Sequence, residues 1–135
     1  MPARSARLLD SSALLAFLNR EDGFEKVRAL LKAAARARGS VLMNEIHVGE
    51  VYYVTAKHRS LERADEFLRR LETLPIQLVS NGFPEVLEAA RIKARFPVSY
   101  ADAFAVATAI RTKAVIVTGD RELAHVEHLV NIDWL

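Results

Sequence analysis

Short, uninterrupted apolar runs alternate with segments of helical apolar spacing along this chain. Strands that are buried on both faces have such runs, because the helices that connect parallel strands cover each face of the sheet. The pattern therefore predicts an α/β fold: a three-layer α/β/α sandwich with a central, mainly parallel sheet of four to five short strands. The expected strands cover residues 6–9, 41–43, 76–79, 114–118 and 129–134. The expected helices cover residues 13–18, 24–37, 47–57, 61–74, 84–96, 100–110 and 121–126.

Length and composition limit the kind of protein. At 135 residues the chain has the size of a single domain with its own core, which we expect over residues 1–135. The absence of cysteine excludes disulfides and thiolate metal sites, and it suits a reducing cytoplasm. No apolar run approaches the ~20 residues of a membrane helix, so we expect a cytoplasmic protein without membrane contact.

The overall charge says little about the partners of the chain. The formal net charge is only +2, which is weak support for binding to nucleic acid. Local basic clusters are present, but most clusters of this kind are solvated helix faces, and we expect the same of these. They lie at residues 36–38, 57–59, 69–70 and 91–95.

The segment 97–110 contains the helix that we expect at the centre of the molecule. Ser99 is a suitable N-cap, and Asp102 follows it at the spacing of a capping box. The residues after Asp102 are apolar on almost every face, which favours a buried helix over a surface one. A carboxylate is thus expected at a helix N-terminus, where negative charge is favoured. A cap alone would explain Asp102 unless further carboxylates lie beside it.

Other acids follow the expected strands. Asp10 ends the first strand and Asp120 ends the strand at 114–118, while Glu45 and Glu50 both follow the second strand. The carboxyl ends of parallel strands share one edge of the sheet, so these acids are expected to meet there. Each acid alone is explained as a cap or a solvated residue. Together they would repel, by about 4 kcal/mol for two charges ~4 Å apart at an effective dielectric of ~20, so the cluster indicates a bound cation.

Oxygen ligands without cysteine suit Mg²⁺ or Mn²⁺. Such an ion keeps several water molecules and leaves room for a phosphate oxygen, so metal-assisted hydrolysis of a phosphodiester is the expected chemistry. We expect Ser12 and Thr118 to hold water or carboxylates beside the metal ligands.

Other chemistries fit the sequence less well. It has no glycine-rich dinucleotide loop, no phosphate-binding P-loop and no HExxH motif. The histidine pairs at one-turn spacing, His47 with Glu50 and His125 with His128, are expected to be surface residues rather than metal ligands. A phospho-acceptor receiver domain also gathers acids at a sheet edge, but it would need a lysine where this chain has residues 118–120.

The acids lie in four stretches of sequence: Leu8–Leu15 (LLDSSALL), Ile46–Tyr53 (IHVGEVYY), Ser99–Ala105 (SYADAFA) and Val117–Asp120 (VTGD). In this order they resemble the four acidic motifs of the PIN domain, and more closely those of the VapC-type toxins of prokaryotic toxin–antitoxin pairs. The resemblance covers essentially the whole chain. It implies a PIN-like fold and a ribonuclease that depends on Mg²⁺ or Mn²⁺.

The resemblance also implies which residues carry the activity. Asp10, Glu50, Asp102 and Asp120 match the acids that bind the metal and catalyse the reaction. Glu50 matches its motif better than Glu45, which stays the alternative second acid. The family further implies an RNA substrate, a homodimer, and a cognate antitoxin whose C-terminal tail lies across the site.

The leading hypothesis is thus a metal-dependent endoribonuclease, the toxin of a toxin–antitoxin pair, in which lysine and arginine side chains at the rim orient the RNA backbone. The alternative is a non-catalytic PIN-like module that binds RNA or protein. A phosphate-ester hydrolase for a small molecule is a weaker third hypothesis.

Overall fold

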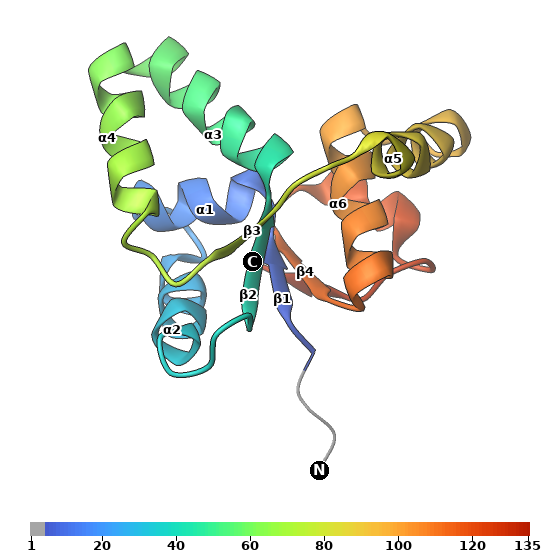
Figure 1. Ribbon diagram of the computed structural model, residues 1–135, viewed down its shortest axis with the longest axis horizontal. Helices are drawn as coiled ribbons and strands as arrows, with labels where there is room; N and C mark the ends of the chain where they lie inside the picture. The colour runs from blue at the N-terminus through green and yellow to red at the C-terminus, as the bar shows by residue number, and fades with distance from the viewer. Residues whose placement is uncertain (1–4) are drawn as a thin grey trace.

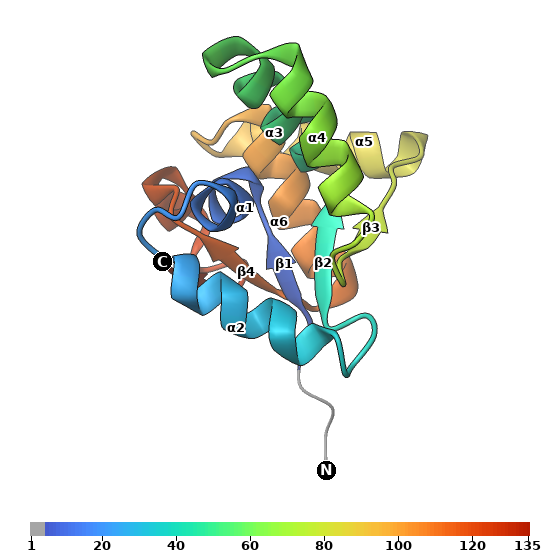
Figure 2. The same cartoon turned by 90° about the vertical axis from the view of Figure 1, so that its left-hand side faces the viewer.

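A five-stranded parallel sheet forms the middle of the molecule (Figures 1 and 2). The structure is a computed structural model that describes residues 5–135, so residues 1–4 of the domain expected over 1–135 lie outside it. The strand order is β3-β2-β1-β4-β5, and every neighbouring pair is parallel. The predicted parallel sheet is therefore confirmed. Its strands are β1 Arg7–Leu9, β2 Val41–Asn44, β3 Gln77–Val79, β4 Val115–Thr118 and β5 Ile132–Trp134.

Helices cover both faces of the sheet, as predicted for an α/β/α sandwich (Figure 1). One layer contains α1 Ser11–Leu18, α2 Phe24–Ala34, α3 Glu45–His58 and α4 Leu61–Leu71. The opposite layer contains α5 Phe83–Arg95, α6 Tyr100–Thr112 and the short 3₁₀ helix η1 Arg121–Val126. In the described residues 5–135, no helix combines the length and the apolar character that a membrane crossing requires.

The core has two halves, one on each face of the sheet. Successive residues of a strand point to opposite faces, so Leu8 belongs to the half under α5 and α6 while Leu9 belongs to the half under α1 to α4. Ile116 and Val117 of β4 divide in the same way. The central strands β1, β2 and β4 are mostly apolar because both of their faces are buried, whereas the edge strands β3 and β5 are more exposed.

The helix α6 is the buried helix that the sequence predicts. The Ser99 hydroxyl caps it by accepting a hydrogen bond from the backbone N–H of Asp102 at 3.1 Å. Every residue from 102 to 109 is buried. Asp102 therefore lies at the start of the buried middle section of α6.

Several element ends differ from the sequence expectation. The helices α2 and α4 end at Ala34 and Leu71, earlier than expected, because bonds of the i to i+3 type tighten the chain there before it enters the next strand. The last strand begins at Ile132 rather than at residue 129, because a turn that bonds Leu129 to Val126 precedes it.

The carboxyl edge of the sheet is where α1, α3 and η1 begin. Each of these helices is capped by the last residue of a strand or a residue just beyond it. Asp10 accepts from the N–H of Ala13, Asn44 from that of Ile46, and Asp120 from that of Glu122. Caps of this kind satisfy backbone N–H groups that have no partner within the helix. The same geometry places two acidic side chains at one edge.

Candidate active site at the carboxyl edge of the sheet

Asp10 is a buried carboxylate that three donors surround. It is 2% exposed. Its Oδ1 accepts from the Ser12 hydroxyl at 2.6 Å and from the Ala13 N–H at 2.9 Å, and its Oδ2 accepts from the Thr118 hydroxyl at 2.5 Å. Burial raises the pKa of Asp10, while the hydrogen bonds from Ser12, Thr118 and Ala13 oppose that rise because they favour the ionised form. Asp10 is thus both a helix cap and an acceptor held in one orientation.

Ser12 and Thr118 join the ends of β1 and β4 around this carboxylate. The hydroxyl oxygens of Ser12 and Thr118 lie 3.3 Å apart. The Gly119 N–H donates to Ser12 at 3.0 Å and the Asp120 N–H donates to Thr118 at 2.9 Å. Each hydroxyl donates its one proton in a hydrogen bond to Asp10 and accepts a hydrogen bond from a backbone N–H. The two hydroxyls therefore fix the chain that leads into Asp120 as well as the Asp10 side chain.

Asp102 and Asp120 lie against each other at the same edge. Asp102 is 5% exposed, and Asp120 is half-buried at the start of η1. Burial, a hydrogen bond with Asp120 and repulsion by its charge raise the pKa of Asp102 to about 8, although the Ser99 hydroxyl lowers it; the charge of Asp10 raises it further. At neutral pH burial and the neighbouring carboxylate therefore favour the protonated form of Asp102 in the metal-free protein.

The two candidates for the second acid lie in different surroundings. Glu50 is half-buried in α3, and its Oε1 accepts from the Ser11 hydroxyl at 2.9 Å, which ties it to the first residue of α1. Glu45 is the exposed first residue of α3. The structure thus directs Glu50 toward the helix that Asp10 caps, whereas Glu45 faces solvent.

His47 differs from the expectation of a surface residue. It is 0% exposed, its Nε2 donates to the backbone carbonyl of Ala101 at 2.9 Å, and its Nδ1 has no hydrogen-bond partner. Burial lowers the pKa of His47 against the attraction of Asp10 and Glu50, which lie nearby. The surface prediction is wrong here because the position, four residues before buried Val51, faces the core. His125 and His128 are exposed, as expected.

The family model of the PIN domain matches residues 7–129. The chain belongs to the PIN domain family. No curated protein matches it.

Solved structures share the fold of this PIN domain at low sequence identity. DNA-bound VapBC from Salmonella typhimurium matches with a TM-score of 0.73 and 16% identity, over 97% of this chain and 98% of that one. VapBC2 from Rickettsia felis, bound to a DNA fragment from its promoter, matches with a TM-score of 0.72 and 13% identity, over 96% of this chain and 98% of that one. VapC20 from Mycobacterium tuberculosis, a toxin that cleaves the sarcin–ricin loop, matches with a TM-score of 0.69 and 17% identity, over 88% of this chain and 94% of that one.

The acids of this PIN domain fit a divalent cation. Oδ2 of Asp102 is buried and has no hydrogen-bond partner, which is costly for a polar atom unless a ligand meets it. Carboxylate oxygens of Asp102, Asp120 and Glu122 lie within 4.8 Å of one another. An all-oxygen donor set of this kind suits Mg²⁺ or Mn²⁺.

Glu122 is the acid that the sequence analysis overlooked. It is exposed on η1, and its N–H donates to Asp120 at 3.0 Å. The 3₁₀ turn after β4 returns its carboxylate toward Asp102. Its place two residues after Asp120, in the first turn of an expected helix, is the feature of the sequence that indicates it.

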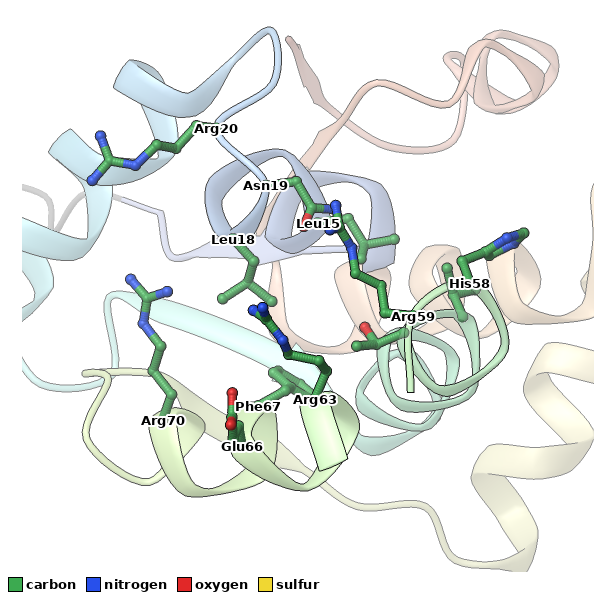
Figure 3. A pocket seen from close by; sticks show the side chains of 12 residues that line it. Leu15, Leu18, Asn19, Arg20, His58, Arg59, Arg63, Glu66, Phe67 and Arg70 are labelled. Atoms are coloured by element: carbon green, nitrogen blue, oxygen red, sulfur yellow. The ribbon is translucent and has the colours of Figure 1, made fainter. Parts of the chain in front are cut away.

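A basic groove lies among the helices α1, α3 and α4 (Figure 3). Its volume is about 390 Å³. Ser11 and Glu50 bond to each other at the acid site, and Leu15 and Val54, one turn further along the same two helices, line the groove. The groove thus continues from the acids along α1 and α3.

Arginines surround the apolar part of this groove. Leu18 and Phe67 lie between the side chains of the arginines in Figure 3, and Glu66 is its one acidic lining residue. Arg70 also stacks over the ring of Phe17 at 5.2 Å, which holds its charge near the groove. Arg59 and Arg70 belong to clusters that we expected to be solvated helix faces; both are exposed and both line the groove. The lining arginines are Arg20, Arg59, Arg63 and Arg70.

Proposed function

We propose that this PIN domain is a metal-dependent endoribonuclease of the VapC type, with Asp10, Glu50, Asp102 and Asp120 as its metal-binding and catalytic acids. The observation that carries the proposal is the buried, unpartnered Oδ2 of Asp102 beside Asp120. Membership of the PIN family and the shared fold of VapC proteins support it. The Ser11 bond to Glu50 favours that residue over the exposed Glu45.

Each acid has a distinct task in this proposal. A divalent ion supplies positive charge for the phosphodiester and a water that ionises readily. Asp102 and Asp120, whose carboxylate oxygens lie close together, would hold the cation, and Asp102 would release its proton to solvent when the ion binds. The Ser12 and Thr118 hydroxyls orient Asp10 and favour its ionised form against the effect of burial on its pKa, and Ser11 orients Glu50.

Cleavage of a labelled, structured RNA by the purified chain tests the proposal. We expect cleavage with Mg²⁺ or Mn²⁺, none with EDTA, and a loss of about 10²-fold or more for Asp102→Asn. Glu50→Gln is expected to lose activity, while Glu45→Gln keeps it. Equal loss in these two variants would contradict the choice of Glu50. Equal cleavage by wild type and Asp102→Asn would contradict the site.

The rival functions make different predictions. A non-catalytic module that binds RNA or protein would bind without cleavage and would not need Asp102. A small-molecule phosphate-ester hydrolase would hydrolyse a simple phosphate diester as fast as RNA.

We place the cognate antitoxin in the basic groove. The arginines of the groove would pair with an acidic segment of the antitoxin, and Leu18 and Phe67 of the groove would pack against apolar side chains of that segment. The partner is consistent with solved structures of VapBC pairs that share this fold. The homodimer and the cytoplasmic location stay predictions.

Charge reversal at Arg63 tests the groove. Arg63→Glu is expected to weaken inhibition by the antitoxin at least tenfold, because one charged contact is worth about 1.5–3 kcal/mol. RNA cleavage without antitoxin is expected to stay within threefold of wild type. Loss of cleavage itself would assign the groove to RNA instead.

A further inference from the structure

We propose that His47 is a positioning residue that holds the first turn of α6, and with it Asp102, in register with the helix that carries Glu50. The inference deepens the proposed function, because it concerns the geometry of the same metal-binding acids.

The peptide group that joins Ala101 to Asp102 is held at both ends. Its carbonyl oxygen accepts from Nε2 of His47 at 2.9 Å, and its N–H donates to the Ser99 hydroxyl at 3.1 Å. A carbonyl only accepts, so the proton of the imidazole lies on Nε2. Two hydrogen bonds from opposite sides leave this peptide plane little freedom to rotate. The direction in which the Asp102 side chain leaves the backbone is thereby fixed.

The helix α3 is fastened to both neighbouring helices at the site. Glu50 accepts from Ser11 of α1, and His47, one turn earlier, donates to Ala101 of α6. In the described part of the chain, the bond from His47 is the only hydrogen bond between α3 and α6. Residues three apart on a helix lie on the same face. His47 and Glu50 therefore act from one face of α3 on the two helices that open at the sheet edge.

Burying a histidine at position 47 costs free energy that an apolar side chain there would not. Its Nδ1 has no partner, and an unsatisfied buried polar atom costs about 1–3 kcal/mol. Val51 lies on the same buried face of α3, so an apolar residue at position 47 would also pack there. The histidine is thus not required by packing. Its hydrogen bond to the peptide before Asp102 is the compensating gain.

Two substitutions separate the hydrogen bond from the packing. His47→Gln keeps an N–H donor that can reach the Ala101 carbonyl, whereas His47→Leu keeps bulk without a donor. Val51→Ala is the matched control, because it removes buried volume from the same face of α3 without touching the hydrogen bond. Ser99→Ala removes the other hydrogen bond of the same peptide group, the one that the Asp102 N–H donates to the Ser99 hydroxyl. It tests whether the orientation of this peptide matters without any change to His47.

The first measurement is amide hydrogen exchange of Asp102 in the metal-free protein. We expect faster exchange in His47→Leu and in Ser99→Ala, and a rate near that of wild type in His47→Gln and Val51→Ala. The second measurement is Mn²⁺ affinity by calorimetry, where His47→Leu is expected to lose about tenfold, the usual effect of removing a residue that orients a ligand. His47→Gln is expected to recover most of this affinity.

The outcomes distinguish this inference from the proposed function. Unchanged exchange and unchanged Mn²⁺ affinity in His47→Leu would overturn the positioning role and leave the nuclease proposal intact. Wild-type protein that binds no Mn²⁺, together with the expected exchange pattern, would overturn the metal site and leave the positioning role. If His47→Leu does not fold, unchanged exchange and affinity in Ser99→Ala overturn the inference, and the expected changes there support it.

Discussion

The ionisation of Asp102 depends on its burial and on the carboxylate beside it. Its pKa rises from 3.8 to about 8 through burial and through the adjacent Asp120. Between about pH 4 and pH 8 the folded state therefore holds a proton on Asp102 that the unfolded chain has already released. Metal binding would replace this proton, which links affinity for the ion to pH.

The stability of the metal-free protein is expected to reflect this proton. Because the folded pKa is raised, the contribution of Asp102 to stability is complete below about pH 4 and is lost as pH rises through about 8. The melting temperature in EDTA is expected to fall by several degrees between pH 5 and pH 9. Asp102→Asn is expected to flatten this decline, and Mn²⁺ at pH 8 to raise the melting temperature of wild type only. Parallel curves for wild type and variant would contradict the prediction.

The sequence predicts some of these residues well and others poorly. Asp10 and Asp120 were found because they end apolar runs, and Asp102 because it follows an N-cap. The burial of His47 was missed, since a polar residue on a helix is usually exposed and its partner carbonyl lies 54 positions away. Glu122 was missed because its approach to Asp102 depends on the 3₁₀ geometry of η1.

At the scale of elements, hydrogen bonds between the side-chain amides of Asn44 and Asn81 fix the start of α3. Oδ1 of Asn44 accepts from the N–H of Ile46 and from Nδ2 of Asn81, and its own Nδ2 donates to Asn81 and Thr108, all at 2.9 Å. Thr108 in turn donates to the carbonyl of Phe104 at 2.7 Å. The network joins β2, α6 and the turn before α5. Its members satisfy one another, so it fixes where α3 begins.

Asn44→Ala is expected to cost about 2–4 kcal/mol of unfolding free energy, because it removes a cap, the amide partner of half-buried Asn81 and the donor to the buried Thr108 hydroxyl. Ser60→Ala is the matched control, since Ser60 caps α4 at the surface through one bond to Arg63. It is expected to cost only about 1 kcal/mol. Urea denaturation of both variants measures the difference, and equal costs would show that the network adds nothing beyond a cap.

Element types were predictable and element ends less so. The apolar runs and helical spacings indicated every strand and helix of the described chain. The boundaries of α2, α4 and β5 depend on turns that no periodicity marks. The pairing of Asn44 with Asn81 joins residues 37 positions apart and depends on the order of the strands.

At the scale of the whole molecule, β1 belongs to both halves of the core. Leu8 packs under α5 and α6, and Leu9 packs under α1 to α4. A substitution that destabilises the half of the core on one face is therefore expected to destabilise the other half as well, because both halves share β1. The molecule is expected to unfold in one transition, as most domains of this size do.

Phe67→Ala tests this coupling. Phe67 of α4 is buried in the half of the core on one face of the sheet, while Trp134, the only tryptophan, packs on the opposite face. The substitution is expected to cost about 3–5 kcal/mol. The urea midpoint seen by Trp134 fluorescence is expected to shift as much as the midpoint seen by far-ultraviolet circular dichroism. A smaller shift in fluorescence would mean that the two halves unfold separately.

The position of β1 between β2 and β4 also has a consequence for synthesis. Asp10 appears early in translation, but the Thr118 hydroxyl that orients it belongs to β4, and Asp120 follows still later. Chains are made from the N-terminus, and segments far apart in sequence pair slowly. A ribosome that makes this chain therefore carries no assembled acid cluster until β4 and Asp120 have been translated, more than 100 residues after Asp10. A nuclease built on this topology would leave its own messenger intact while it is being made.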